Sequence, residues 1–249
     1  MKIIDYPLKH YNERKDGKSA KYIMMHYTDM LSLQDTIDIL NKREVSSHYC
    51  VDEDGTVLKF VDEDKRAWHA GRSYWYGETD MNSVSIGIEI QNHGHTNGYK
   101  PFPEKQIAAV IELTLEIMKR HNIPAKNIIG HSDVAPDRKP DPGHFFPWEE
   151  LANKHGIGVW AKNVTKEHIE HAENIIGNLS KIEKLFVDIG YAPVGVFGEN
   201  TPTLKDIIIA FQRHYEPELF LDSDKKDGIG KPLLETIALA VCLRNQLSI

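Results

Sequence analysis

The residues with the clearest chemical potential lie in the stretch GHSDVAPDRKPDPGH, which runs from Gly130 to His144. The stretch combines two histidines, three aspartates, an arginine and a lysine with three prolines. Proline is excluded from helix interiors and from central strands, so irregular backbone is expected here. Irregular backbone can direct separated side chains at one point, which a helix does only at fixed spacing. His131 and Asp141 are therefore candidate ligands of one metal ion.

His26 is the candidate for a third ligand. It lies near the end of the apolar run YIMMHY, over 22–27, which has the length of a buried strand. Two histidines and one carboxylate leave one tetrahedral position open, as catalytic zinc sites do. The sequence contains no HExxH pattern, which excludes the helix-borne zinc site of that type. Two alternatives stay open: a buried His26 satisfied by hydrogen bonds, and a structural zinc with a fourth protein ligand.

Glu89 is a candidate of a different kind, in the stretch SVSIGIEIQN over 83–92. Apolar and polar residues alternate there, which predicts a strand with one face towards a hydrophobic core. Glu89 shares the polar face with Ser85 and Gly87, and these small residues leave room for a cleft above the sheet. The alternative is a solvated outer face, which antiparallel sheets often have.

Strands and helices alternate around these candidates. Ser32 is a predicted N-cap, Pro103 is expected to open a helix, and Asp54 with Gly55 is expected to form a hairpin turn. The order predicts an α/β fold with a mixed central β-sheet flanked by helices. The expected elements are helices over 32–43 and 104–122, a hairpin over 47–61, and strands over 22–27, 83–92 and 127–130.

The composition changes after Trp148, which predicts two domains, a catalytic domain over 1–160 and a small helical domain over 161–249. The second region reads as helices separated by a glycine- and proline-rich turn and by an acidic loop. Its apolar residues at helical spacing are expected to form a three-helix core. These residues are Leu185, Phe186, Ile189, Leu204, Ile208 and Phe211.

The bulk composition excludes some classes of partner. A net charge of -7 in 249 residues argues against nucleic-acid binding and against an anionic membrane surface. No apolar run approaches the roughly 18 residues that a membrane-spanning helix needs. The first residues lack the apolar block of a signal peptide, so we expect a cytoplasmic monomer, or a periplasmic one if an export segment was removed.

Five ordered motifs resemble those of the zinc-dependent N-acetylmuramoyl-L-alanine amidases of the AmpD and AmiD type, which share the fold of the peptidoglycan-recognition proteins. The resemblance extends from about Lys21 to Trp148. Two positions depart from the usual family pattern: Asp137 replaces a common glycine, and His144 replaces a common proline. The motifs are the strand that ends near His26, SSHYCVDEDG, AWHAG, SIGIEIQN, and GHSDVAPDRKPDPG followed by FPW.

The resemblance implies one Zn²⁺ per chain, with His26, His131 and Asp141 as its ligands. It also implies two catalytic residues, Glu89 as the general base and Lys139 beside the reacting carbonyl. The residues expected to bind substrate at the cleft are Trp68, His69 and Asn92.

The implied activity is hydrolysis of the amide bond between N-acetylmuramic acid and L-alanine in peptidoglycan or muropeptides. The stretch over 181–215 resembles a three-helix peptidoglycan-binding module, which would hold the enzyme on its substrate. A non-catalytic peptidoglycan-recognition protein is the alternative. Proteins of that class share the fold but lack part of the ligand set.

Overall fold

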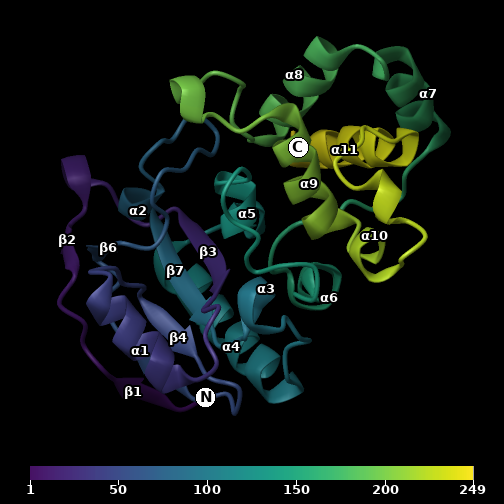
Figure 1. Ribbon diagram of the computed structural model, residues 1–249. Helices are drawn as coiled ribbons and strands as arrows, with labels where there is room; N and C mark the ends of the chain where they lie inside the picture. Colours follow the sequence, from purple (N-terminus) through teal and green to yellow (C-terminus); the bar gives the residue numbers. More distant parts are fainter. Residues whose placement is uncertain (249) are drawn as a thin grey trace.

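A mixed β-sheet lies at the centre of the computed structural model, which describes residues 1–248. The strand order is β1-β5-β4-β7-β3-β8 (Figure 1). Strands β4 and β5 are antiparallel, as expected for a hairpin, and the other neighbouring strands are parallel. The strands are β1 (Ile3–Asp5), β3 (Tyr22–Tyr27), β4 (Tyr49–Val51), β5 (Val57–Lys59), β7 (Ser85–Ile90) and β8 (Ile128–Gly130). A second, two-stranded sheet pairs β2 (Tyr11–Glu13) with β6 (Lys65–Ala67).

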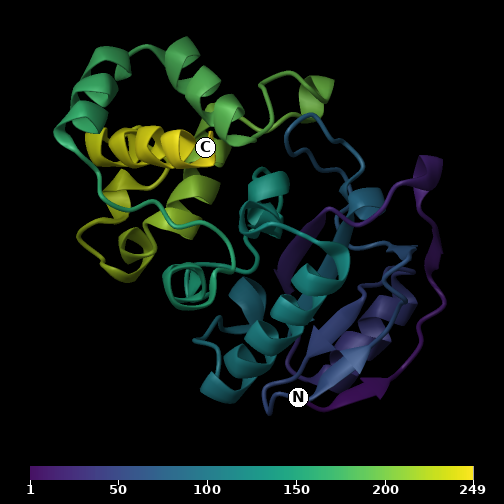
Figure 2. The ribbon, with the colours of Figure 1, turned by 180° about the vertical axis from the view of Figure 1, so that it is seen from behind.

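Helices cover both faces of the main sheet, which confirms the predicted fold class. Helix α4 (Glu104–His121) packs its apolar side on the alternating isoleucines of β7, and Figure 2 shows it crossing that face. Helix α1 (Leu33–Lys42) lies on the opposite face, over β4 and β5 (Figure 1). The Ser32 side chain accepts a hydrogen bond from the Asp35 backbone N–H at 3.1 Å, so the predicted N-cap is confirmed.

Four local details differ from the sequence prediction. Strand β7 begins at Ser85 because α2 (Met81–Val84) precedes it. Pro103 is the N-cap residue, and α4 begins one residue later. Asp54 and Gly55 are expected to supply the positive backbone angles of a tight hairpin turn, but only Gly55 has positive φ. The proline-rich stretch starts with one helical turn, α5 (His131–Val134), because the Asp133 carboxylate accepts the Gly130 backbone N–H at 2.8 Å.

The C-terminal helices gather beside one end of the sheet (Figure 1). The predicted core residues are confirmed as buried, except Leu204, which is only partly buried. Helix α7 adds a fourth long helix to the three that were expected in this part of the described chain. No helix over 1–248 is long and apolar enough to cross a membrane. The remaining helices are α3 (Gly94–Asn97), α6 (Trp148–His155), α7 (Lys166–Ile175), α8 (Leu179–Ile189), α9 (Leu204–Tyr215), α10 (Glu218–Leu221) and α11 (Leu234–Leu247).

One hydrophobic cluster joins the two regions that the sequence predicts as domains. It contains Met24 of β3 and Val134 of α5 together with Phe186 and Phe211 of the C-terminal helices. Trp75, in the loop before α2, belongs to the same cluster. The C-terminal helices therefore pack on the sheet domain through a continuous apolar core.

Candidate metal centre and catalytic cleft

The parallel strands bring the candidate residues to one edge of the sheet. In the register between β3 and β7, His26 lies directly beside Glu89, so both side chains point to the same face. Strand β8 runs beside β3 on its other side, and His131 follows directly after β8. Ligand sites form at the carboxyl ends of parallel strands for this reason.

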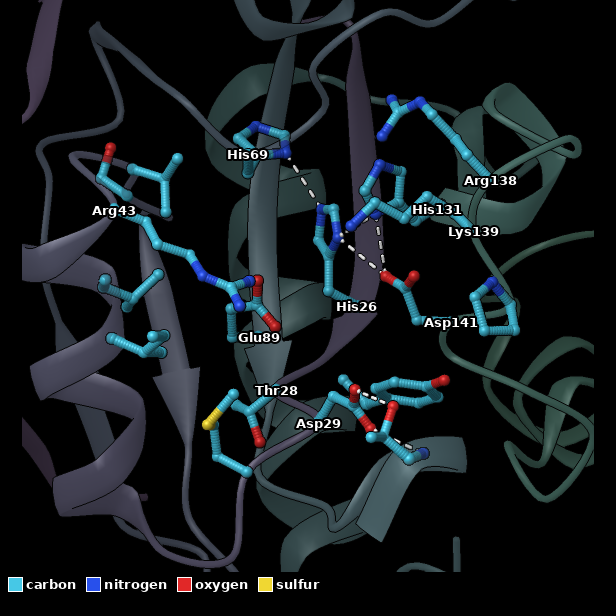
Figure 3. Close-up of a pocket in the computed structure, with 18 of the residues that line it drawn as sticks. His26, Thr28, Asp29, Arg43, His69, Glu89, His131, Arg138, Lys139 and Asp141 are labelled. Atoms are coloured by element: carbon cyan, nitrogen blue, oxygen red, sulfur yellow. Dashed lines mark hydrogen bonds and ion pairs between the residues drawn. The ribbon is translucent and has the colours of Figure 1, made fainter.

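Three ligand atoms from distant parts of the chain converge at this edge (Figure 3). The Nδ1 atoms of His26 and His131 are 2.9 Å apart. The Asp141 Oδ2 atom is 3.1 Å from the first and 2.9 Å from the second. All three side chains are buried, with exposed fractions of 4% or less.

The hydrogen bonds behind His131 determine which of its nitrogen atoms carries the proton. Its Nε2 atom lies 3.1 Å from the Ala70 carbonyl oxygen, which can only accept. The proton of a neutral His131 is therefore on Nε2, and the Nδ1 lone pair points at His26 and Asp141. A lone pair that faces a carboxylate oxygen requires a cation or a proton between the two.

A chain of hydrogen bonds gives His26 the same orientation. The Ser85 hydroxyl donates to the Met81 carbonyl at 2.6 Å, so its oxygen is free to accept from His69 Nε2 at 3.4 Å. The Nδ1 atom of His69 then accepts from His26 Nε2 at 3.0 Å. The Nδ1 atom of His26 is left with a lone pair directed at the same point.

Two imidazole lone pairs and one carboxylate oxygen thus face one another, and this donor set fits a zinc ion. Ligand atoms about 2 Å from a tetrahedral ion lie a little over 3 Å apart, close to the distances here. Burial and the neighbouring His131 together lower the pKa of His26 to about 4, against the opposing effect of Asp141. Burial alone would raise the pKa of Asp141, but the two imidazoles hold it well below its usual range. The ligands therefore favour the deprotonated forms that bind metal.

Glu89 lies beside the ligands but does not join them. Burial raises its pKa well above the usual range, and the nearby Asp141 carboxylate adds to this, while Lys139 opposes it. Its Oε2 atom is buried and has no hydrogen-bond partner among residues 1–248. A half-buried carboxylate with one buried, unpaired oxygen beside a metal site is suited to taking up and releasing a proton.

A cavity of about 430 Å³ opens over these groups. Lys139 and Trp68 contribute to its wall, together with His69, as expected for residues near a substrate. Asn92 does not line it: its side chain is fully buried and binds the Lys100 carbonyl and the Gly94 backbone N–H. The sequence analysis did not name the other residues of the wall as candidates. They come from the end of β3 and the loop after it, from α1 and the loop after it, from α3, and from the proline-rich stretch. They are Tyr27, Thr28, Asp29, Met30, Ile39, Leu40, Arg43, Val45, Ser46, His95, Thr96, Arg138 and Pro140.

Arg43 and Arg138 are the two arginines of this wall (Figure 3). Arg43 follows the last turn of α1 and extends into the cavity from the side opposite the metal ligands. Arg138 instead binds the AWHAG segment and the residue that follows it, since its Nη2 donates to the Ala70 carbonyl and its Nε donates to the Arg72 carbonyl at 3.0 Å. The ionisable character of the proline-rich stretch pointed to Arg138, but no sequence signal pointed to Arg43.

The two departures from the family pattern both lie where the sheet domain meets the C-terminal helices. Asp137 forms an ion pair with Arg72, which also donates to the Asn200 carbonyl. The His144 ring stacks on Phe220 of α10 with ring centres 5.4 Å apart. Both departures are therefore accounted for by contacts outside the metal site.

Comparison with known proteins agrees with this geometry. The family described as N-acetylmuramoyl-L-alanine amidase matches residues 16–144. The amidase AmiD of Escherichia coli K12 is 35% identical over 233 residues, which cover 86% of this chain and 82% of AmiD. A solved complex of E. coli AmiD with anhydro-N-acetylmuramic acid-L-Ala-D-γ-Glu-L-Lys has a TM-score of 0.75, with 31% identity over 91% of this chain and 89% of that one. AmpDh3 from Pseudomonas aeruginosa has a TM-score of 0.79, with 27% identity over 94% of this chain and 95% of that one.

Proposed function

The chain belongs to the N-acetylmuramoyl-L-alanine amidase family, and from this we propose how its cleft carries out the reaction. The enzyme hydrolyses the amide bond between N-acetylmuramic acid and L-alanine in peptidoglycan or muropeptides, as part of cell-wall turnover and recycling. We propose that His26, His131 and Asp141 hold one zinc ion. The convergence of two imidazole lone pairs and a carboxylate oxygen is the observation that supports this most directly.

Zinc bound there would supply a Lewis acid, which polarises the amide carbonyl and acidifies water. Glu89 is the base: it accepts a proton from the attacking water and delivers it to the leaving amine of L-alanine. Its raised pKa supports both halves of this role, because a carboxylate with an ordinary pKa releases protons easily but holds them poorly. The Lys139 ammonium and a bound cation both favour the ionised form of Glu89 that starts the reaction.

Lys139 is the proposed partner of the oxyanion. Its side chain lines the cavity beside the ligands, and its charge is close enough to lower the pKa of Glu89. An ammonium in a partly closed cleft stabilises the negative charge that develops on the carbonyl oxygen. Removing one such donor typically slows catalysis about 100- to 1000-fold.

Trp68 and His69 divide the proposed substrate-binding role. The Trp68 indole N–H is held by Asn12 at 2.8 Å, which fixes the ring at the cavity wall for contact with the sugar or peptide. The hydrogen bond from His26 favours a role for His69 in orienting His26 as a metal ligand. Peptidoglycan binding by the C-terminal helices, the cytoplasmic compartment and the monomeric state stay predictions.

The first test uses two muropeptides, one with an anhydro sugar and one with an ordinary sugar, and the purified full-length chain. After chelation, mass spectrometry should detect no release of the peptide, and added Zn²⁺ should restore release. Glu89→Gln should reduce turnover about 100- to 10,000-fold, as expected for loss of a general base, and leave zinc affinity near that of the wild type.

The matched control is Glu173→Gln, which removes an exposed carboxylate on α7 far along the chain from the cleft. Its activity should equal that of the wild type. If the zinc-loaded wild type binds both muropeptides and cleaves neither, the assignment fails and a recognition protein takes its place. If Glu89→Gln cleaves normally, the proposed base is wrong even though the amidase assignment stands.

A further inference from the structure

We propose that the C-terminal helices position the metal ligands through a buried hydrogen-bond hub at Asp133. Tyr191 and His214, both from the helical region, are the positioning residues. This inference rests on the proposed zinc site. It assigns the helical region a part in the chemistry that is separate from any binding of peptidoglycan.

Asp133 collects hydrogen bonds from three directions and has an exposed fraction of only 1%. Its Oδ1 atom accepts from the Tyr191 hydroxyl at 3.1 Å. Its Oδ2 atom accepts from His214 Nδ1 at 2.9 Å and from the Gly130 backbone N–H at 2.8 Å. Two of these three donors belong to the helical region, and the third directly precedes the ligand His131.

The hub connects to both loop ligands through the backbone. The Ser132 backbone N–H donates to the Asp141 carbonyl at 2.8 Å, so the residue after His131 is tied to the backbone of Asp141 itself. A Cβ added at Gly130 would lie 3.0 Å from Pro142 and 3.2 Å from the Asp133 carboxylate. Movement of the Asp133 carboxylate would therefore shift the backbone on which both ligands are mounted.

The positioning residues are themselves held in place. The His214 ring stacks between Trp148, with centres 4.0 Å apart, and Tyr215, with centres 4.1 Å apart. This stacking directs Nδ1 at Asp133, while Nε2 is buried and has no partner over 1–248. Tyr191 is fully buried and its ring packs edge-on against Trp75 and Phe186. Neither polar group serves another purpose that the described contacts reveal.

The expected effect follows from the distance of these residues from the ion. Groups that hydrogen-bond directly to metal ligands typically change metal affinity about 10- to 100-fold when they are removed. Tyr191 and His214 act through Asp133 and the backbone, so we expect the lower end, about 10-fold. Loss of zinc affinity should accompany the loss of activity, because the ligands and not the substrate are displaced.

The experiment compares full-length Tyr191→Phe, His214→Ala and His214→Asn with the wild type. Zinc affinity is measured by competition with a chromogenic chelator, and thermal unfolding of the zinc-free proteins reports on the fold. Tyr191→Phe and His214→Ala should each weaken zinc binding about 10-fold. His214→Asn should recover most of the affinity, because its side-chain amide can donate to Asp133 from near the position of Nδ1. The matched control is Tyr215→Phe, which removes a hydroxyl from the same aromatic cluster and should bind zinc as the wild type does.

Each outcome decides the proposal. Wild-type zinc affinity in folded Tyr191→Phe and His214→Ala would overturn it and leave the hub with a purely structural role. An equal loss in Tyr215→Phe would also overturn it, because any damage to the cluster would then suffice. A wild type that binds no zinc would instead contradict the proposed function, so the two failures are distinguishable. If His214→Ala does not fold, Tyr191→Phe decides alone, because it changes one atom and keeps the ring.

Discussion

The orientation of His26 depends on a residue that has no side chain. A Cβ at Gly87 would lie 2.6 Å from the His69 ring, so glycine is what allows that ring to lie flat over β7. The Nδ1 atom of His69 in turn accepts a hydrogen bond from His26 Nε2, which leaves the Nδ1 lone pair of His26 for a metal. A glycine in the middle of a strand thus contributes to the metal site indirectly, through His69 and His26.

The first prediction at the residue scale concerns Gly87→Ala. The new methyl group should displace His69, free the proton of His26 to move between its nitrogens, and weaken zinc binding about 10-fold. Chelator competition measures the affinity. In a His69→Ala background the same substitution should have little further effect, because the clash no longer exists. Equal losses in both backgrounds would show that the methyl group acts on the strand and not through His69.

The residue types of the site could be predicted from the sequence, but several of their relations could not. His26, His131 and Asp141 stand out as ionisable groups in apolar or proline-rich surroundings. The link from His69 to His26 depends on strand register and on the fold of the AWHAG loop, which spacing alone does not determine. Arg43 enters the cavity from the end of an amphipathic helix, where a basic residue is ordinarily explained by the helix dipole.

At the scale of the element, strand order decides where the chemistry lies. The alternation in β7 predicted its core face correctly, while the other face is neither solvated nor apolar. Ser85 and Gln91 on that face have exposed fractions of 0% and 2%, because loops and α1 cover it. The sequence could not reveal this cover, since it comes from segments far away along the chain.

Helix α9 ends in a buried carboxylate that allows a prediction of pH dependence. Glu216, its C-cap residue, has an exposed fraction of 7% and an Oε2 atom without a partner among the described residues. Burial raises its pKa to about 7, against a hydrogen bond from Thr236. The folded state thus binds the proton more tightly than the unfolded chain, in which glutamate titrates near pH 4.5. Stability should fall as the pH rises from about 4.5 to about 7, with the full cost present above pH 7.

Glu216→Gln should therefore stabilise the protein at pH 8 and have little effect near pH 4.5. The expected gain at pH 8 is at most roughly 3.5 kcal/mol, from a rise in pKa from 4.5 to about 7 at about 1.4 kcal/mol for each pKa unit. Urea unfolding at the two pH values measures it. Glu173→Gln, which removes an exposed carboxylate on α7 that does not act on Glu216, is the control and should change stability little at either pH. A gain for Glu216→Gln that is the same at both pH values would contradict the assignment to ionisation.

On the scale of the whole molecule, the two predicted domains are joined by a shared apolar core as well as by a linker. The apolar cluster that contains Phe186 and Phe211 also contains Met24, Trp75 and Val134 from the sheet domain. The change of composition after Trp148 marks a change of architecture, from a sheet to helices. It does not mark a boundary across which the two parts lose contact, because burial between distant segments leaves no local signal in the sequence.

The last prediction distinguishes the covalent connection between the sheet domain and the C-terminal helices from their noncovalent packing. Residues 162–165 are exposed, so a protease site inserted between Asn163 and Val164 should be cleaved without harm. After cleavage the halves should stay together, held by the shared cluster, and should keep wild-type zinc affinity.

The fragment 1–163 expressed alone should lose at least about 10-fold in zinc affinity, because Asp133 loses two of its donors. It should also bind an apolar dye, since the apolar face against the helices becomes exposed. Analytical centrifugation measures whether the halves stay together, the dye assay measures exposed apolar surface, and chelator competition measures zinc affinity. A monomeric fragment with full zinc affinity would mean that the helices are dispensable for the metal site.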